Sequence, residues 1–315
     1  MNILDNIKSK FRFKSLYDMQ RVLSNEDKCI KFLEMVIWEG VPVSPFDKTS
    51  KVYVCSNGMY RCKNTGKYFT IKTGTIFENT KLSLMQWFMA IYLVTSHKKG
   101  IASTQLAKDI NVTQKTAWVL LHKIRMILAC ENDNELSGEI ECDETFIGGK
   151  NSNRHLDKKV KNSQGRSFKD KTPVQGILQR NGKLNAYVVP NTQSSSLLPN
   201  IRRCVAPDSI IYSDEWWGYR NLDEFFREHH FVDHKRKQYA DGNITTNRME
   251  GAWRIFKTAI VGTHHNCVRK RHLQKYVNEF VFRYNTRSME EFDRFVHAII
   301  NSTLRITKNE VLYGY

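Results

Sequence analysis

The sequence lacks the paired cysteines that a disulfide framework or an intact zinc ribbon requires. Its seven cysteines are odd in number and far apart, and no Cys-x-x-Cys motif occurs. Disulfide scaffolds are short and rich in cysteine, and structural zinc needs four closely placed N or S ligands. We therefore expect reduced thiols, no zinc, and a protein that works inside the cell.

Long apolar runs are also missing. A membrane-spanning helix needs roughly 20 apolar residues, and no run in the sequence approaches that length. The N-terminus has no basic start followed by an apolar core, so it does not resemble a secretory signal. We expect no membrane partner and a cytoplasmic location, associated with the nucleoid.

Positive charge is what the sequence has in excess. The 315 residues include 49 Lys and Arg against 32 Asp and Glu, which gives a formal net charge of +17. Neutralising phosphates and releasing counterions supplies most non-specific affinity for nucleic acids. With 41% hydrophobic residues the chain can also bury a core, which excludes global disorder. A nucleic-acid partner is the leading interpretation, and a basic surface kept for solubility is the alternative.

Helical and β patterns alternate in the N-terminal half. Residues 1–38 have apolar positions at helical spacing, with a capping sequence at Ser24–Asp27. Residues 39–80 contain short alternating segments, 51–54, 60–63 and 67–77, separated by Gly, Pro, Ser and Thr. This pattern predicts a small antiparallel β module.

Residues 81–130 have the pattern of a helix-turn-helix. A short helix leads to a turn at Asn111, and a second helix begins after Thr113. The second helix is expected to present its first polar residues and His122 outward. The residues expected to contact DNA are Lys98, Lys99, Gln114, Lys115, Thr116, Lys123 and Arg125. An ordinary helical hairpin is the alternative.

The C-terminal half predicts a mixed sheet flanked by helices. A polar linker at 131–138 is followed by strand 139–147, basic segment 150–172, strands 173–180 and 183–190, helix 193–204, strand 208–213, helix 215–228, a short strand 230–234, basic loop 235–246, and helices 247–260, 271–284 and 289–304. Hairpin-linked strands followed by alternating helix and strand indicate an α/β fold. The basic segment is either a solvated loop or an arm that faces DNA.

Three carboxylates lie where metal-dependent phosphoryl transfer would need them. Asp143 and Asp214 belong to predicted strands, and Glu250 lies on a predicted helix. Neighbouring strands would project both aspartates toward one sheet edge, where a docked helix could bring Glu250 close. Mg²⁺ prefers such hard oxygen ligands, and two ions roughly 3.5–4 Å apart can activate the attacking oxygen and stabilise the leaving one. Taken singly, each acid is more typical of a turn, a helix cap or a surface ion pair.

The helix that carries Glu250 has a polar face suited to a phosphate backbone. At about 100° per residue, Asn247 and Lys257 lie within about 60° of Glu250, and Arg254 shares that face. Trp253 lies near the same face, where it could stack on a base or simply pack.

Other glutamates near Asp143 compete for the same role. Strand alternation sends Glu139 and Glu141 to the same face as Asp143, but further back along the strand. Glu144 is expected to point to the opposite face. All three therefore rank below Asp143 as candidate ligands.

These motifs resemble the three catalytic blocks of DDE transposases. The blocks are Asp143-Glu-Thr-Phe-Ile-Gly-Gly-Lys150, Tyr212-Ser-Asp214 and Asn247-Arg-Met-Glu250-Gly-Ala-Trp-Arg-Ile-Phe-Lys257. They are most similar to the ISXO-like group of bacterial insertion-sequence transposases, relatives of the Merlin elements. Further similar stretches are Thr73-Gly-Thr-Ile-Phe77, Lys98-Lys-Gly-Ile101, Thr113-Gln-Lys-Thr-Ala-Trp118 and Phe282-Arg-Tyr-Asn285. The likeness extends over roughly residues 25–300.

The resemblance implies an RNase H-like catalytic domain over residues 139–305. It implies a transposase that binds terminal inverted repeats in double-stranded DNA, cleaves them and joins them to target DNA as a homo-oligomer. Two Mg²⁺ or Mn²⁺ ions would be held by Asp143, Asp214 and Glu250, with Asn247 and Lys257 as supporting groups. A nuclease or resolvase of the same fold that cuts without joining, and a non-enzymatic DNA-binding regulator derived from a transposase, are the alternatives.

The sequence departs from this family upstream of the acids. Relatives carry a zinc ribbon with a Cys-Pro-x-Cys and a Cys-x-x-Cys knuckle. Here these correspond to Ser44-Pro-Phe-Asp47 and Cys62-Lys-Asn-Thr65, so that Cys62 is the one cysteine retained. We therefore predict a degenerate ribbon over residues 39–80 that binds no zinc.

Overall fold

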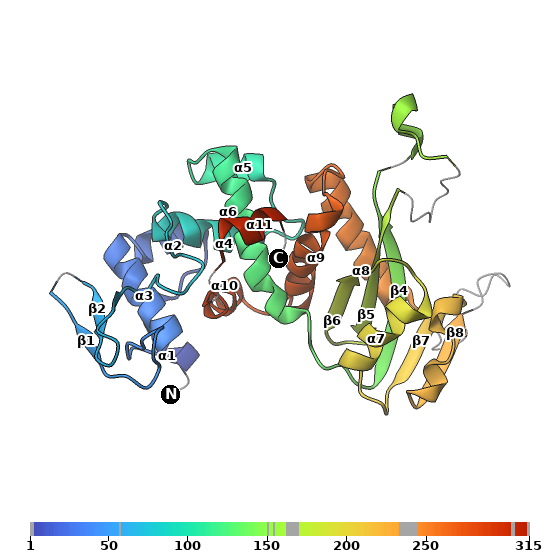
Figure 1. The fold of residues 1–315 in the computed structure, drawn as a ribbon, viewed down its shortest axis with the longest axis horizontal. Helices are drawn as coiled ribbons and strands as arrows, with labels where there is room; N and C mark the ends of the chain where they lie inside the picture. The colour runs from blue at the N-terminus through green and yellow to red at the C-terminus, as the bar shows by residue number, and fades with distance from the viewer. Residues whose placement is uncertain are drawn as a thin grey trace. The chain divides into compact units, whose positions relative to one another are not determined.

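A computed structural model shows a chain that divides into two compact units, residues 1–128 with 288–315 and residues 129–287 (Figure 1). The structure describes residues 3–56, 58–149, 151–153, 155–161, 170–232, 245–303 and 306–313. Most of the predicted basic loop 235–246, and residues 162–169 of the predicted basic segment, lie outside the described residues. Within the described ranges, every helix is too short or too polar to cross a membrane.

The first unit is largely helical. Its α-helices are α1 (Ile3–Phe11), α2 (Leu16–Val22), α3 (Glu26–Trp38), α4 (Leu84–Ser96), α5 (Ser103–Asp109), α6 (Gln114–Ile127), α10 (Glu291–Ile300) and α11 (Lys308–Tyr313). The Asn25 side chain caps α3 by accepting a hydrogen bond from the Lys28 N–H. Phe295 of α10 packs against Phe32 and Phe88, at centroid distances of 5.8 and 5.7 Å. The sequence assigned α10 to the catalytic domain, but its aromatic side chain completes the core of the first unit.

A three-stranded antiparallel sheet also belongs to the first unit. Its strands are β1 (Val52–Val54), β2 (Tyr60–Cys62) and β3 (Tyr68–Phe69), in the order β1-β2-β3. The first two strands match the prediction. The third is much shorter than the predicted segment 67–77, which continues as turns. One face of the sheet is packed, because Tyr60, Cys62 and Phe69 are buried against Trp38.

Helices α5 and α6 have the predicted order and turn. Asn111 adopts a left-handed φ of 53°, and the Thr113 hydroxyl caps α6 by accepting from the Thr116 N–H at 3.2 Å. The expected outward position of His122 is wrong, and so is the assignment of Arg125 as a DNA contact. Their exposed fractions are 0% and 1%, because the later turns of α6 pack against α4 and α11.

The second unit is built on a five-stranded mixed sheet, as predicted. Its strands are β4 (Glu139–Ile147), β5 (Thr172–Gln179), β6 (Leu184–Val188), β7 (Ile210–Asp214) and β8 (Glu228–Val232), in the order β6-β5-β4-β7-β8 (Figure 1). The pairs β4–β5 and β5–β6 are antiparallel, and β4–β7 and β7–β8 are parallel. This arrangement is consistent with an RNase H-like core.

Helices cover both faces of this sheet. On one face α8 (Asn247–Thr258) and α9 (Leu273–Asn285) bury Met249, Phe256 and Phe280 against Val174 and Leu178. On the other face α7 (Ser194–Cys204) buries apolar side chains against the alternate residues of the strands, including Ile140, Ile177 and Ile211. The alternation of side chains along the strands therefore produces two separate cores, one on each face of the sheet.

Residues 131–138 are not the free linker that their polarity predicts. Asn132 is buried and donates a hydrogen bond to the Ala186 carbonyl at 2.6 Å. Leu136 is fully buried and pairs with Val205 in an isolated parallel bridge. The polar residues are buried here because backbone and amide groups of the second unit satisfy their hydrogen bonds.

The predicted helix 215–228 is also wrong. Two short 3₁₀ turns, Trp217–Tyr219 and Leu222–Glu224, replace it. Between them Asn221 adopts a left-handed φ of 68°, which interrupts any continuous right-handed helix.

Candidate metal centre

The parallel pairing of β4 and β7 brings Asp143 and Asp214 side by side. The register pairs Glu139 with Ile210 and Glu141 with Tyr212, so Asp143 lies level with Asp214. Here β7 ends, while β4 continues to Ile147 along β5. Both aspartates are half-buried.

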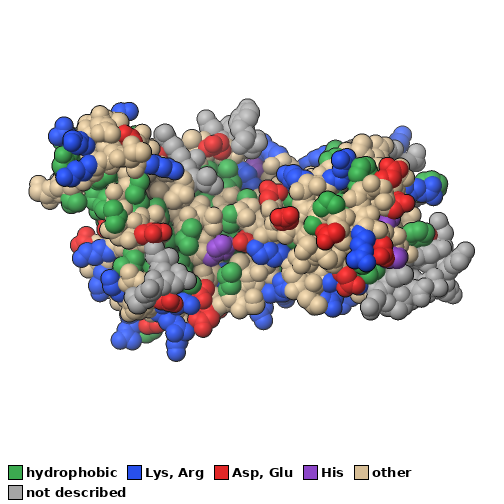
Figure 2. Space-filling view, turned by 90° about the horizontal axis from the view of Figure 1, so that it is seen from below, with side chains coloured by type: hydrophobic (Ala, Val, Ile, Leu, Met, Phe, Trp, Pro, Cys, Tyr) green, Lys and Arg blue, Asp and Glu red, His purple; other side chains and the backbone are tan. Residues whose placement is uncertain are grey.

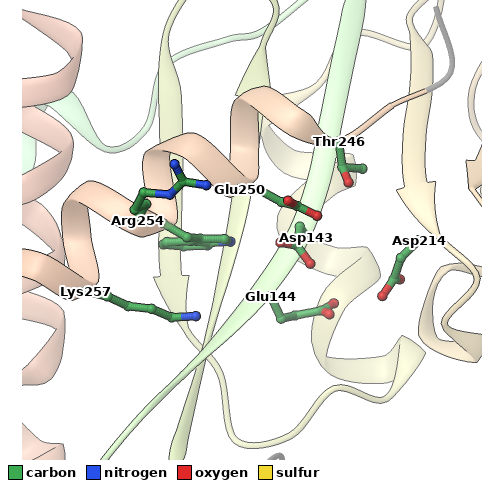
Figure 3. Close-up of a pocket in the computed structure, with 8 residues that line it drawn as sticks. Asp143, Glu144, Asp214, Thr246, Glu250, Arg254 and Lys257 are labelled. Carbon is green, nitrogen blue, oxygen red and sulfur yellow. The ribbon is translucent and has the colours of Figure 1, made fainter. Parts of the chain in front are cut away.

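Glu144 joins the two aspartates, contrary to the expectation that it would point away. Carboxylate oxygens of Asp143, Glu144 and Asp214 all lie within 4.8 Å of one another (Figure 3). Alternation does start the Glu144 side chain toward the opposite face. Because β7 stops at Asp214, however, the long side chain of Glu144 can reach around that edge of β4. The three acids form a cluster that we call the carboxylate cluster.

Tyr219 lies buried behind the carboxylate cluster. Burial, and then the negative charge of Glu144, raise the pKa of Tyr219 well above its ordinary value. The phenol therefore keeps its proton at neutral pH, and a neutral phenol can donate a hydrogen bond to a carboxylate. Tyr219 falls inside the predicted helix 215–228, so no sequence signal indicates this position beside the acids.

Helix α8 adds one acid and two cations to the same hollow. Glu250, Arg254 and Lys257 line it together with the carboxylate cluster, and Figure 3 shows their side chains directed toward the acids. The described residues that line the hollow do not include Asn247, which is exposed at the start of α8. Trp253 forms a wall rather than a free stacking surface, because only 3% of it is exposed.

A buried ion pair fixes the start of α8 against β4. Glu141 accepts a hydrogen bond from the Arg180 Nε at 2.9 Å and another from the Met249 N–H, also at 2.9 Å. Arg180 also donates to the Thr245 carbonyl at 2.9 Å. Glu141 is thus engaged in holding the helix rather than directed into the hollow. Glu139 and Glu141 share one face of β4, and this pair of acids is the feature of the sequence that could have indicated a basic partner such as Arg180.

A glycine lets α8 approach the sheet closely. Gly176 is the β5 partner of Asp143, and a Cβ built there would lie 2.4 Å from the Met249 Cε and 2.6 Å from the Trp253 Cζ2. Such distances are shorter than any van der Waals contact, so a larger residue would require the Met249 and Trp253 side chains to move. Gly176 therefore leaves room for two buried side chains of the helix that carries Glu250.

The other predicted DNA contacts lie in the first unit. Lys98, Lys99, Gln114 and Lys115 are exposed, and Thr116 and Lys123 are half-buried. Lys115, Thr116 and Lys123 line a second hollow, where the Lys123 amine lies 5.9 Å from the centre of the Trp87 ring. Burial lowers the pKa of Lys123.

Comparison with known proteins places the carboxylate cluster within a known domain. Residues 135–285, which include Asp143, Glu144, Asp214 and Glu250, match the ISXO2-like transposase domain. The chain is 27% identical over 237 residues to an uncharacterized protein in transposable element ISH50 of Halobacterium salinarum, covering 71% of this chain and 77% of that protein. It is 30% identical over 122 residues to an uncharacterized transposase-like protein of Haemophilus influenzae, covering 39% of this chain and 97% of that protein. The chain belongs to the ISXO2-like family of transposases.

Proposed function

We propose that this transposase cleaves DNA at the terminal inverted repeats of an insertion sequence and joins the cut strand to target DNA, with divalent metal ions at the carboxylate cluster. The observation that carries the proposal is the cluster itself, which faces Arg254 and Lys257 across one hollow. Acids alone would repel a phosphate backbone. Acids that hold metal cations, beside two basic side chains, can bind a phosphate backbone.

The donor set fits Mg²⁺ or Mn²⁺. Its atoms are carboxylate oxygens, which these hard cations prefer, and both ions keep several waters, so few protein ligands are needed. Asp143, Glu144 and Asp214 would provide the first ligands, and Glu250 would complete the site from α8. When bound, two ions would activate the attacking oxygen and stabilise the leaving oxygen.

The chain's own cations would position the DNA. Arg254 and Lys257 lie on successive turns of α8, so they can bind consecutive phosphates beside the acids. Asn247, exposed at the beginning of the helix, would contact the backbone further along. In the first unit α6 would enter the major groove, with Lys98, Lys99, Gln114, Lys115, Thr116 and Lys123 as contacts. A homo-oligomer would bring the two ends of the element together.

A strand-transfer assay tests the proposal. The substrate is a pre-cleaved end taken from the DNA that flanks the coding region, mixed with plasmid target and Mg²⁺. The native protein should give joined product, and Asp214→Asn should abolish joining while retaining DNA binding. Asparagine keeps the oxygen that accepts the Trp216 N–H at 3.1 Å, so the turn should remain intact.

Asp208→Asn, at an exposed position before the same strand, is the matched control and should transfer strands normally. Unchanged joining by Asp214→Asn would refute the site. Cutting without joining by the native protein would favour a resolvase, and binding without either reaction would favour a regulator.

A further inference from the structure

The three-stranded sheet of the first unit has an outer face with an unusual composition. Strand register makes Tyr53 the partner of Arg61, and Arg61 the partner of Tyr68. Because directly paired residues point to the same side, these three side chains form one row across the sheet. The alternate residues, such as Tyr60 and Cys62, are buried on the opposite face, so the row faces outward.

Both tyrosines of this row are accessible and lie beside positive charge. Tyr53 is 43% exposed and Tyr68 is 54% exposed. The Lys51 amine lies 5.6 Å from the centre of the Tyr53 ring, and the Arg61 guanidinium lies 5.7 Å from the centre of the Tyr68 ring.

Two lysines, Lys51 and Lys63, extend the row at one side. The Lys63 N–H donates to the Lys51 carbonyl at 2.9 Å, which places these two residues opposite each other. We call five residues of this face the outer row, and none of them is acidic: Lys51, Tyr53, Arg61, Lys63 and Tyr68. At the end of the first unit that carries this sheet, Figure 2 shows Lys and Arg side chains intermixed with apolar ones and with some Asp and Glu.

Solubility alone does not explain the outer row. The solvent face of an antiparallel sheet is ordinarily polar, and lysines without aromatic neighbours would keep it soluble. Exposed aromatic rings alternating with cations are the composition of surfaces that stack nucleic-acid bases and neutralise their phosphates. In a duplex the base faces are already stacked on one another. The rings therefore suit a strand whose bases are unpaired.

We propose that the outer row binds single-stranded DNA. Tyr53 and Tyr68 lie about 10 Å apart, twice the spacing between strands, so one DNA strand crossing the sheet can stack a base on each ring. Arg61 lies between them, with Lys51 and Lys63 at the side, to neutralise the intervening phosphates. This binding goes beyond the proposed strand transfer, because it needs neither metal nor the carboxylate cluster.

Fluorescence anisotropy of the full chain, without divalent metal, tests this inference. The probes are a labelled oligothymidine of about 16 nucleotides, near the upper site size for such surfaces, and a duplex of the same length. Salt of about 0.2 M suppresses contacts that depend on charge alone. Tyr53→Leu and Tyr68→Leu should each weaken binding of the single strand about tenfold and leave duplex binding nearly unchanged, because base–aromatic stacking has that scale.

Three control variants keep the result interpretable. Tyr53→Phe and Tyr68→Phe retain the rings and should bind oligothymidine as the native protein does. Tyr17→Leu removes a tyrosine that is 72% exposed on α2 of the same unit, and should change nothing. Native-like binding by the Tyr53→Leu/Tyr68→Leu double variant would overturn the inference, as would equal losses for single strand and duplex. Strand transfer is measured separately, so either proposal can fail alone.

Discussion

Among single residues, Glu144 most changes the chemistry expected of the hollow. It adds a third carboxylate within 4.8 Å of the two aspartates. We predict that Glu144→Gln weakens Mn²⁺ binding about 10–100-fold, the scale found even for outer partners of metal ligands. Isothermal titration of the apoprotein with Mn²⁺ measures this without any DNA. Glu224→Gln, at an exposed position of the same unit, should bind Mn²⁺ normally. Equal affinities for both variants would remove Glu144 from the site.

Cys62 is the one cysteine that the β module retains at the positions where relatives carry zinc ligands. Burial raises the pKa of its thiol, but hydrogen bonds from Ser44, Ser50 and Thr65 outweigh burial and lower the pKa from 9.0 to about 6. Hydroxyl groups thus favour the thiolate form of this buried cysteine.

This lowered pKa predicts how stability depends on pH. Between about pH 6 and 9 the folded protein has released a proton that the unfolded chain still holds. Stability should therefore rise with pH across this window, and the contribution should disappear as the pH falls through about 6. Cys62→Ser should reduce the rise, whereas Cys267→Ser, at an exposed cysteine, should keep it. Denaturant unfolding at several pH values measures the difference. A chelator that lowers the stability of the native protein but not that of Cys62→Ser would instead show a metal bound at Cys62.

At the scale of elements, α8 is positioned by its contacts with β4 and β5 more than by its own sequence. Removing one member of a buried ion pair leaves the other charge without compensation. Arg180→Met should therefore lower the free energy of unfolding by about 3–5 kcal/mol and reduce strand transfer, because the start of α8 is released. Denaturant unfolding and the transfer assay measure the two effects.

A matched variant separates this effect from the loss of charge alone. Arg203 pairs with Asp133 at 3.1 Å, but both side chains are more than half exposed. Arg203→Met should cost about 1 kcal/mol or less, since exposed pairs contribute little. If both arginine variants lost the same stability, the Glu141–Arg180 pair would not be what holds α8.

The elements also show what the sequence could predict. Periodicity correctly predicted the mixed sheet, the two helices around Asn111 and the helix that carries Glu250. It failed where distant contacts decide the conformation. His122 is buried where α6 packs against α4 and α11, and Glu144 reaches the two aspartates beside the end of β7. Each of these depends on a neighbour that no local pattern contains.

For the whole molecule, the net charge of +17 predicts that the affinity for DNA falls as the salt concentration rises. Each phosphate contact contributes about −0.9 to the slope of log affinity against log salt concentration. Lys115→Gln should reduce that slope by about 1 and weaken binding across all duplex sequences, if this exposed lysine of α6 contacts a phosphate. Anisotropy at several salt concentrations measures the slope. Lys10→Gln, on α1, is the control and should leave the slope unchanged.

The path of the chain through the two units affects the order in which they can fold. Phe295, which completes the aromatic core of the first unit, is synthesised only after the whole of the second unit. During translation the second unit, with the carboxylate cluster, can therefore fold while the first unit still lacks part of its core. A chain whose synthesis stops before Phe295 would carry the acids without an intact first unit. The first unit begins earlier in the sequence, but it is thus the later of the two to be completed.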